Sequence, residues 1–440
     1  MADWGSSRWK LEDPILEIIA TIALALVLFL DAVKLQIDEL RSRWIIPVLV
    51  LGPGTALVIS LGAGALIWLI GFPVTLAFIG GAVLASTDPV VLREVIRDPR
   101  IPRPIRQALR IEAGMNDLVV LPTILILIAV ATSTGYGSVD WIEFVLKLIV
   151  LGPVVGFAIG CAGSWLIFRL DKQAPIRWEL QSLYGIGLVL GSYAAGTAVG
   201  GDGCLAAFAA GLAVVLLNQT LCDRFLEYGE TTSEMTMLLS FVLFGVVLSE
   251  VLPDAPFWPS IALAAILIFA VRPGSLGLVL SRARASWEAR LFISWFGPRG
   301  LNSLLLALLA VHAGVPGAEE LFAVVGIVVL ASTVLHGASA TPATAWYARR
   351  ISGEVHEEER ESDAAAIFGG HEEVIPRISV EELQQRLESP DPPLILDVRS
   401  RMSYEQDNGR IAGDIRVPPD RIAEWARTMP EGLSVVAYCT

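Results

Sequence analysis

The sequence predicts an all-α polytopic membrane protein with about eleven transmembrane helices, followed by a small α/β domain. Of its 440 residues, 54% are hydrophobic and only 18% are charged, whereas soluble domains carry about 25% charged residues. The mean hydropathy is +0.62. The net charge of −13 is uneven, because residues 351–440 contain nine Arg, no Lys and nineteen Asp or Glu and so hold −10 of it. We therefore expect a membrane domain at 1–350, an acidic linker at 351–375 and a small domain at 376–440.

The apolar segments each approach the roughly 20 residues that a helix needs to cross a bilayer. They run at about 14–35, 45–70, 72–93, 107–134, 141–168, 180–200, 203–218, 235–252, 257–280, 287–312 and 319–348. Residues 1–12 are polar and lead into a full-length segment, which predicts that no signal peptide is cleaved.

Basic residues alternate between the two sides of the predicted membrane. Arg and Lys gather in the first, third, fifth and ninth connections, while the even-numbered connections have essentially none. The seventh is ambiguous, with Arg224 among several acids. Since basic loops stay in the cytoplasm, we expect an outside N-terminus and a cytoplasmic tail.

The third segment contains a predicted helix break. Gly80-Gly81 and Ser86-Thr87-Asp88-Pro89 interrupt it. Pro89 removes a backbone donor and disfavours helical geometry at Asp88, so carbonyl groups near Thr87 lose their partners and could bind a hard cation. Asp88 could balance the positive end of the half-helix that follows. The alternative is a simple proline kink. A second glycine-rich stretch, 196–203, is interpreted as a tight outside turn.

The fourth segment places polar side chains within apolar sequence. Glu112, Asn116 and Asp117 follow i, i+4, i+5 spacing and lie along one side of a helix. Ionisable groups at membrane depth are costly and usually mark an ion or proton path. The alternative is an Asn-Asp pair that caps a helix end. We expect Asp117 to be the residue on which that ion or proton path depends.

The tenth segment contains a basic residue, Arg299, within apolar sequence. It lies mid-span, so its guanidinium needs a carboxylate, and we expect Glu112 to pair with it because Asp117 must remain free to titrate. The alternative is an arginine bonded to backbone carbonyls at a helix break. Arg272 is interpreted as snorkelling to the cytoplasmic side, and His336 as a packing residue.

The four cysteines predict no disulfide framework. Cys161 and Cys204 fall in or beside apolar segments, Cys222 in a loop and Cys439 near the end of the sequence.

The motifs Thr87-Asp88-Pro89, Glu112 to Asp117 and Gly297-Pro298-Arg299-Gly300 resemble, in order and spacing, the cation:proton antiporter family that contains the Na⁺/H⁺ exchangers. Phe29-Leu30-Asp31-Ala32 is similar to its acidic motif in an early helix. The resemblance implies inverted repeats with broken, crossed helices, a core domain that moves against a dimerisation domain, and a homodimer.

The same resemblance implies functional roles for these residues. Asp117 would bind the transported Na⁺ (or K⁺) or the proton, with Asp31 and Thr87, through its main-chain oxygen, nearby. Glu112 and Arg299 would form a structural pair, and Asn116 would fix the helix. The Asn-Asp sequence implies electroneutral, one-for-one exchange. Two departures are expected: the first two helices of the family lack counterparts, and Ala113 replaces a serine found in many relatives.

The tail predicts a second fold. Ser379 begins a capped helix, and strands are expected at 394–398 and 433–438. Asp397-Val398-Arg399, Gly409 to Asp414 and Cys439 resemble a rhodanese-like domain, in which Cys439 would be the persulfide-forming nucleophile. Because the sequence stops at Thr440, we expect a partial regulatory module without sulfurtransferase activity. The alternative is a disordered acidic tail.

Two functional hypotheses follow from these patterns. The first is a secondary transporter in the cell inner or plasma membrane that exchanges a monovalent cation for H⁺, serves pH homeostasis, and needs no cofactor and no nucleic acid. The second is a membrane-anchored sulfurtransferase or redox or sulfur sensor that acts through Cys439. The intramembrane charges favour the first, since an anchor needs none.

Overall fold

The chain divides into two units, residues 1–372 and 373–440, which are described separately. The computed structural model describes residues 11, 14–34, 48–98, 100–132, 143, 146–173, 176–217, 219–281, 286–351, 380–389, 392–398, 409–417, 425–426, 429 and 434–438.

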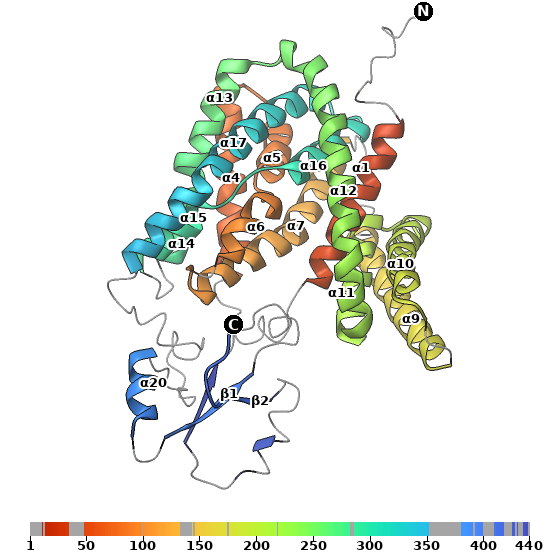
Figure 1. Ribbon diagram of the computed structural model, residues 1–440. Coiled ribbons are helices and arrows are strands. Elements are labelled where there is room, and N and C mark those ends of the chain that lie inside the picture. Colours follow the sequence, from red (N-terminus) through yellow and green to blue (C-terminus); the bar gives the residue numbers. More distant parts are fainter. Residues whose placement is uncertain are drawn as a thin grey trace, which may run out of the picture. The chain divides into compact units, whose positions relative to one another are not determined.

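The first unit is helical wherever long apolar segments occur (Figure 1). Its helices are α1 (Pro14–Val33), α4 (Thr55–Leu69), α5 (Val74–Val83), α6 (Pro89–Arg97), α7 (Arg103–Thr132), α9 (Gly152–Gln173), α10 (Trp178–Ala198), α11 (Gly203–Leu217), α12 (Gln219–Val251), α13 (Phe257–Ile266), α14 (Arg272–Leu280), α15 (Trp287–Trp295), α16 (Leu301–His312) and α17 (Ala318–Ile351). Single π-helical turns precede α4 (η1, Val50–Gly54) and α9 (η2, Lys147–Leu151), and a third (η4, Leu267–Val271) joins α13 to α14. A 3₁₀ turn (η3, Leu252–Asp254) follows α12.

Six helical segments among the described residues are long and apolar enough to cross a membrane. They are Ile15–Val33, Val50–Leu69, Ile105–Thr132, Ile149–Gln173, Phe257–Leu280 and Ala318–Arg350. Shorter apolar helices accompany them, including α5, α11 and α16. The predicted all-α polytopic fold is therefore confirmed.

Two of the apolar segments are broken helices. The third is interrupted as predicted, because α5 ends at Val83 and α6 begins at Pro89. The tenth is also interrupted, because α15 ends at Trp295 and α16 begins only at Leu301; a break here was considered above only as the alternative setting for Arg299. Pro298 cannot donate a helical hydrogen bond, and a proline within a helix clashes with the preceding turn, which accounts for the second break.

The two breaks meet. The backbone N–H of Asp88 donates to the Pro298 carbonyl at 2.9 Å. The Asp88 carboxylate accepts from the backbone N–H of Leu301, also at 2.9 Å. Asp88 therefore balances the N-terminus of α16. Gly300 permits this approach, since a Cβ there would overlap the carboxylate.

Helices α9, α10 and α11 lie together beside α1 (Figure 1). The contact between α9 and α11 is close because a Cβ on Gly156 would overlap the backbone of Ala206 and one on Gly160 would lie 2.6 Å from the Ala210 carbonyl oxygen. The predicted tight turn at 196–203 is present, with Gly200 at a φ of +81°.

Helix α12 is longer than its apolar part. The connection that was expected before residue 235 is helical from Gln219, so Arg224 and Cys222 lie in a helix and their predicted loop is wrong. Residues 219–234 are largely polar, and a search for apolar runs therefore places the start of this helix too late.

The second unit contains a helix and a three-stranded parallel sheet. Helix α20 (Val380–Leu387) precedes strands β1 (Leu394–Asp397), β2 (Ile415–Arg416) and β3 (Val435–Tyr438), in the order β2-β1-β3. Leu394 pairs with Val435, and Leu396 with Ile415. Strands β1 and β3 thus occur where the sequence predicts them, whereas β2 was not predicted. Ser379, Cys439 and nearly all of the predicted linker fall outside the described residues, and the rhodanese-like resemblance stays a prediction.

Candidate functional site

Asp117 is a buried carboxylate with two neutral hydrogen-bond donors. It lies on α7, and only 2% of its surface is exposed. Ser86, in the first break, donates to Oδ1 at 2.7 Å. Asn302, at the start of α16, donates to Oδ2 at 2.8 Å. The side chain thus joins the first break to the helix that follows the second break.

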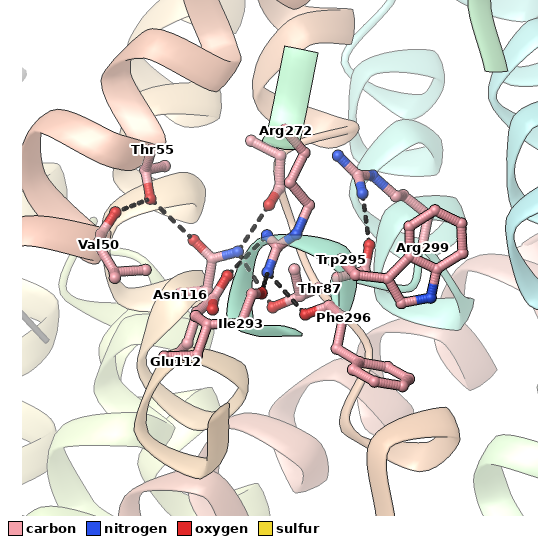
Figure 2. A network of polar contacts seen from close by, with 12 residues as sticks. Val50, Thr55, Thr87, Glu112, Asn116, Arg272, Ile293, Trp295, Phe296 and Arg299 are labelled. Atoms are coloured by element: carbon pink, nitrogen blue, oxygen red, sulfur yellow. Dashed lines mark hydrogen bonds and ion pairs between the residues drawn. The ribbon is translucent and has the colours of Figure 1, made fainter. Parts of the chain in front are cut away.

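Asn116, the neighbour of Asp117, replaces lost hydrogen bonds of the first break (Figure 2). Its amide nitrogen donates to the Ala85 carbonyl at 2.7 Å and to the Thr87 hydroxyl at 3.3 Å. The Thr55 hydroxyl approaches its amide oxygen at 3.5 Å. A carbonyl that α5 can no longer satisfy is thereby paired inside the protein, as a membrane interior requires.

The other predicted acidic residues lie near the same point. Asp31, toward the end of α1, is buried and interacts electrostatically with Asp117 and Asp88. Its Oδ2 has no hydrogen-bond partner among the described residues. Thr87 is also buried, with its hydroxyl toward Asn116. The structure therefore brings these five predicted residues together at the helix breaks.

The predicted ion pair between Glu112 and Arg299 is wrong. Glu112 pairs with Arg272 at 2.7 Å, and both side chains are buried (Figure 2). Arg272 also donates to the Phe296 carbonyl at 2.7 Å. It does not snorkel: only 3% of its surface is exposed. Gly297 leaves room for the guanidinium, which a Cβ there would overlap.

Arg299 instead bonds backbone carbonyls from both breaks, the alternative arrangement considered above. Its Nε donates to the Leu84 carbonyl at 2.9 Å, and its Nη1 to the Gly297 carbonyl. Its own N–H donates to the Ser332 hydroxyl of α17 at 2.9 Å. Backbone carbonyls that lose their helical partners where α5 and α15 end thus accept hydrogen bonds from the buried guanidinium of Arg299. The charge of Glu112 also attracts this guanidinium from a distance. His336 packs nearby, hydrogen-bonded to the Trp295 carbonyl at 3.1 Å.

Four residues of this network were missed by sequence reasoning: Ser86, Asn302, Arg272 and Thr55. Asn302 offered a signal, because it is an amide in an otherwise apolar helix. Arg272 also offered a signal, because it is a charged residue that follows a long apolar run. It was placed too close to the cytoplasmic end of its segment and was therefore interpreted as snorkelling. Ser86 was recognised only as part of the helix break, and Thr55 carried no signal, since serine and threonine are ordinary in membrane helices.

The oxygen atoms near Asp117 that could bind a cation belong to carboxylate, amide and hydroxyl groups. The described residues contain no group of three or more His, Cys, Asp or Glu that could hold a metal ion. Oxygen ligands of this mixed kind suit hard cations. The predicted cation ligands are Asp117, Asp31 and Thr87, and they would hold the ion as a transported substrate.

A sequence model described as "Sodium/hydrogen exchanger, transmembrane" matches residues 4–346. A K⁺/H⁺ antiporter, NhaP, from Alkalimonas amylolytica is 28% identical over 333 residues, which are 75% of this chain and 57% of that protein. The Na⁺/H⁺ antiporter 2 of Zygosaccharomyces rouxii is 27% identical over 321 residues, 68% of this chain and 39% of that protein. The chain thus spans little more than half the length of the first relative and about two fifths of the second.

Among solved structures, the sodium proton antiporter MjNhaP1 from Methanocaldococcus jannaschii aligns with a TM-score of 0.60. The alignment covers 76% of this chain and 86% of that one, at 18% sequence identity. The likeness concerns the fold.

Proposed function

This chain belongs to the sodium/hydrogen exchanger family, and on that premise we propose that it is a secondary active antiporter that exchanges a monovalent cation for a proton across a membrane. One observation carries the proposal: a buried carboxylate, Asp117, lies where two broken helices meet and accepts hydrogen bonds from two neutral side chains, Ser86 and Asn302. A carboxylate at membrane depth is stable only when a proton or a cation neutralises it. Each occupant therefore excludes the other, and alternating exposure of the site couples their fluxes.

The neighbouring residues take supporting roles in this proposal. Asp31 and Thr87 contribute oxygen atoms to the cation, while Asp88 holds the start of α16 in place. Asn116 ties α7 to the first break. The substrate is Na⁺ or K⁺, in keeping with the names of the relatives.

We propose one-for-one exchange. Asn116 is neutral, so Asp117 is the residue that alternates between a proton and a cation, and no net charge crosses the membrane. Asp31 would change this stoichiometry if it also lost and gained a proton during the cycle, because two nearby carboxylates seldom ionise together.

The distribution of basic loops supports an outside N-terminus and a cytoplasmic tail. We propose a regulatory role for that tail. We propose that the protein resides in the cell inner or plasma membrane as a homodimer and serves pH homeostasis. The alternative function, sulfur chemistry at Cys439, is not favoured by any observation among the described residues.

The test is dissipation of an imposed pH gradient in inverted membrane vesicles on addition of NaCl and then KCl. Wild-type protein should dissipate the gradient with at least one salt. Asp117→Asn should abolish this response and still insert in the membrane, while Asp31→Asn and Thr87→Val should weaken the apparent cation affinity more than they reduce insertion.

Asp98→Asn is the matched control, because Asp98 lies in the connection between α6 and α7, outside the site. Its hydrogen bonds to Arg100 lower the pKa of its carboxyl group. Full cation-dependent proton movement in Asp117→Asn would exclude Asp117 as the shared site.

A further inference from the structure

Asn302 is the polar residue of α16 that reaches Asp117. It is the second residue of the helix, and none of its surface is exposed. Its amide nitrogen donates to the Asp117 carboxylate at 2.8 Å. Its amide oxygen is also buried, yet has no hydrogen-bond partner among the described residues.

An unpartnered buried amide oxygen is unfavourable by about 1–3 kcal/mol. An aliphatic side chain, as at Leu301 and Leu304 beside it, would avoid this cost. The hydrogen bond to Asp117 does not remove it, because that bond uses the other end of the amide. The oxygen is therefore available to a ligand that enters the site.

The two ends of the amide suit two states of Asp117. An ionised carboxylate can only accept hydrogen bonds, so the empty site orients the –NH₂ group toward it. A cation on the carboxylate repels that –NH₂ group and attracts the carbonyl oxygen instead. The terminal torsion of asparagine is soft and roughly two-fold, so a half-turn of the amide exchanges the two ends without moving the backbone.

We propose that Asn302 is a cation ligand of the Asp117 site: it donates to Asp117 when the site is empty and turns its Oδ1 toward the cation when the site is occupied. The proposal rests on the proposed function, because it takes Asp117 as the cation-binding carboxylate. An amide oxygen is a common ligand of hard cations such as Ca²⁺. The ligand set thereby includes α16 as well as α1, α7 and the first break.

The backbone that carries Asn302 is held in place. Asp88 accepts from the N–H of Leu301, the residue before Asn302, and holds the first turn of α16 against the first break. A ligand held at a fixed distance discriminates between cations by their size. Asn302 therefore affects the ratio of Na⁺ to K⁺ affinity, and not only the overall rate.

The variants that test this are Asn302→Leu, which has a similar shape but no polar atom, and Asn302→Ser, which retains a shorter oxygen ligand. Ser275→Ala is the matched control, since it removes another buried, unpartnered side-chain oxygen, on α14. Two measurements are made on each purified protein. One is the apparent KM for Na⁺, Li⁺ and K⁺ in proteoliposomes over a range of pH, and the other is the rise in unfolding temperature that each cation produces in detergent.

Asn302→Leu should raise the apparent KM for the preferred cation about tenfold or more, as expected for the loss of one charge-assisted contact. It should also change the Na⁺/K⁺ ratio and reduce the stabilisation by cations. Asn302→Ser should lie between it and the wild type, and supplies the answer if Asn302→Leu does not fold. Ser275→Ala should match the wild type.

Failure of the inference differs from failure of the proposed function. If the wild type transports and Asn302→Leu keeps its KM values, Asn302 is not a ligand and antiport stands. A shifted pH profile with an unchanged cation ratio would reduce Asn302 to a hydrogen-bond donor and also overturn the proposal. A wild type that neither transports nor is stabilised by any of the three cations would remove the proposed function and this site with it.

Discussion

The buried pair of Glu112 and Arg272 permits a quantitative test by a double-mutant cycle. The two side chains are 2.7 Å apart and almost completely buried. Loss of one partner from such a pair costs about 3–5 kcal/mol, because an uncompensated charge stays behind. We expect Glu112→Gln and Arg272→Gln to lower the free energy of unfolding by different amounts within that range.

Glu112→Gln leaves the guanidinium of Arg272 with the Phe296 carbonyl as a partner, so its cost should be near the lower limit, about 3 kcal/mol. Arg272→Gln leaves a carboxylate whose second oxygen, Oε2, already lacks a hydrogen-bond partner among the described residues. Its cost should be near the upper limit, about 5 kcal/mol. The double variant should cost no more than Arg272→Gln alone, which gives an interaction energy of about 3 kcal/mol.

The assay is unfolding in detergent, monitored by tryptophan fluorescence, for the wild type, both single variants and the double variant. The same cycle with Glu112→Gln and Arg299→Gln is the control, because Arg299 bonds backbone carbonyls and not Glu112. Its interaction energy should be clearly smaller. Additive losses for Glu112 with Arg272, or stronger coupling of Glu112 to Arg299, would refute this account of the network.

Three further predictions concern helix packing, the crossing of the breaks and stoichiometry. Gly156→Ala should destabilise the protein by about 1–3 kcal/mol, because the new methyl group would overlap the backbone of α11. Gly187→Ala, which has open space around it, should be neutral or slightly stabilising in the same unfolding assay, and equal losses in the two would contradict the packing. Gly300→Ala should displace the Asp88 carboxylate from the start of α16 and reduce cation-dependent proton flux at least severalfold; an unchanged flux would show that this contact is dispensable. With Asn116 next to Asp117, Na⁺-dependent exchange in proteoliposomes should not respond to a potential clamped with K⁺ and valinomycin, and a rate that rises severalfold with voltage would argue for a second proton carrier.

The sequence was sufficient to predict most of the membrane fold. Apolar runs of bilayer length can satisfy their backbone groups only as helices, so their positions follow from local composition. The break before Pro89 was predictable for the same reason, since proline acts on its own turn. The start of α12 was not, because its polar first half carries no apolar signal.

The components of the candidate site were partly visible in the sequence, because polar residues such as Asp117 and Asn116 are conspicuous in apolar segments. Their partners were not. Helical spacing shows which residues share a face of α7, but not which helix packs against that face. Two arginines, Arg272 and Arg299, could satisfy the charge of Glu112, and the sequence offered no measure of their depth.

Tertiary structure made that choice. Arg272 reaches Glu112 because Gly297 leaves room for its guanidinium, and Arg299 does not need a carboxylate because Leu84 and Gly297 present free carbonyls where their helices end. Asn302 reaches Asp117 because Asp88 holds the start of α16 across the first break. The contacts of Arg272 with Glu112, Asn302 with Asp117, Leu301 with Asp88 and Arg299 with Leu84 join residues that are about 160 to 215 positions apart. A buried charge or amide takes the partner that close packing brings to it, and packing between distant helices is a property of the whole fold.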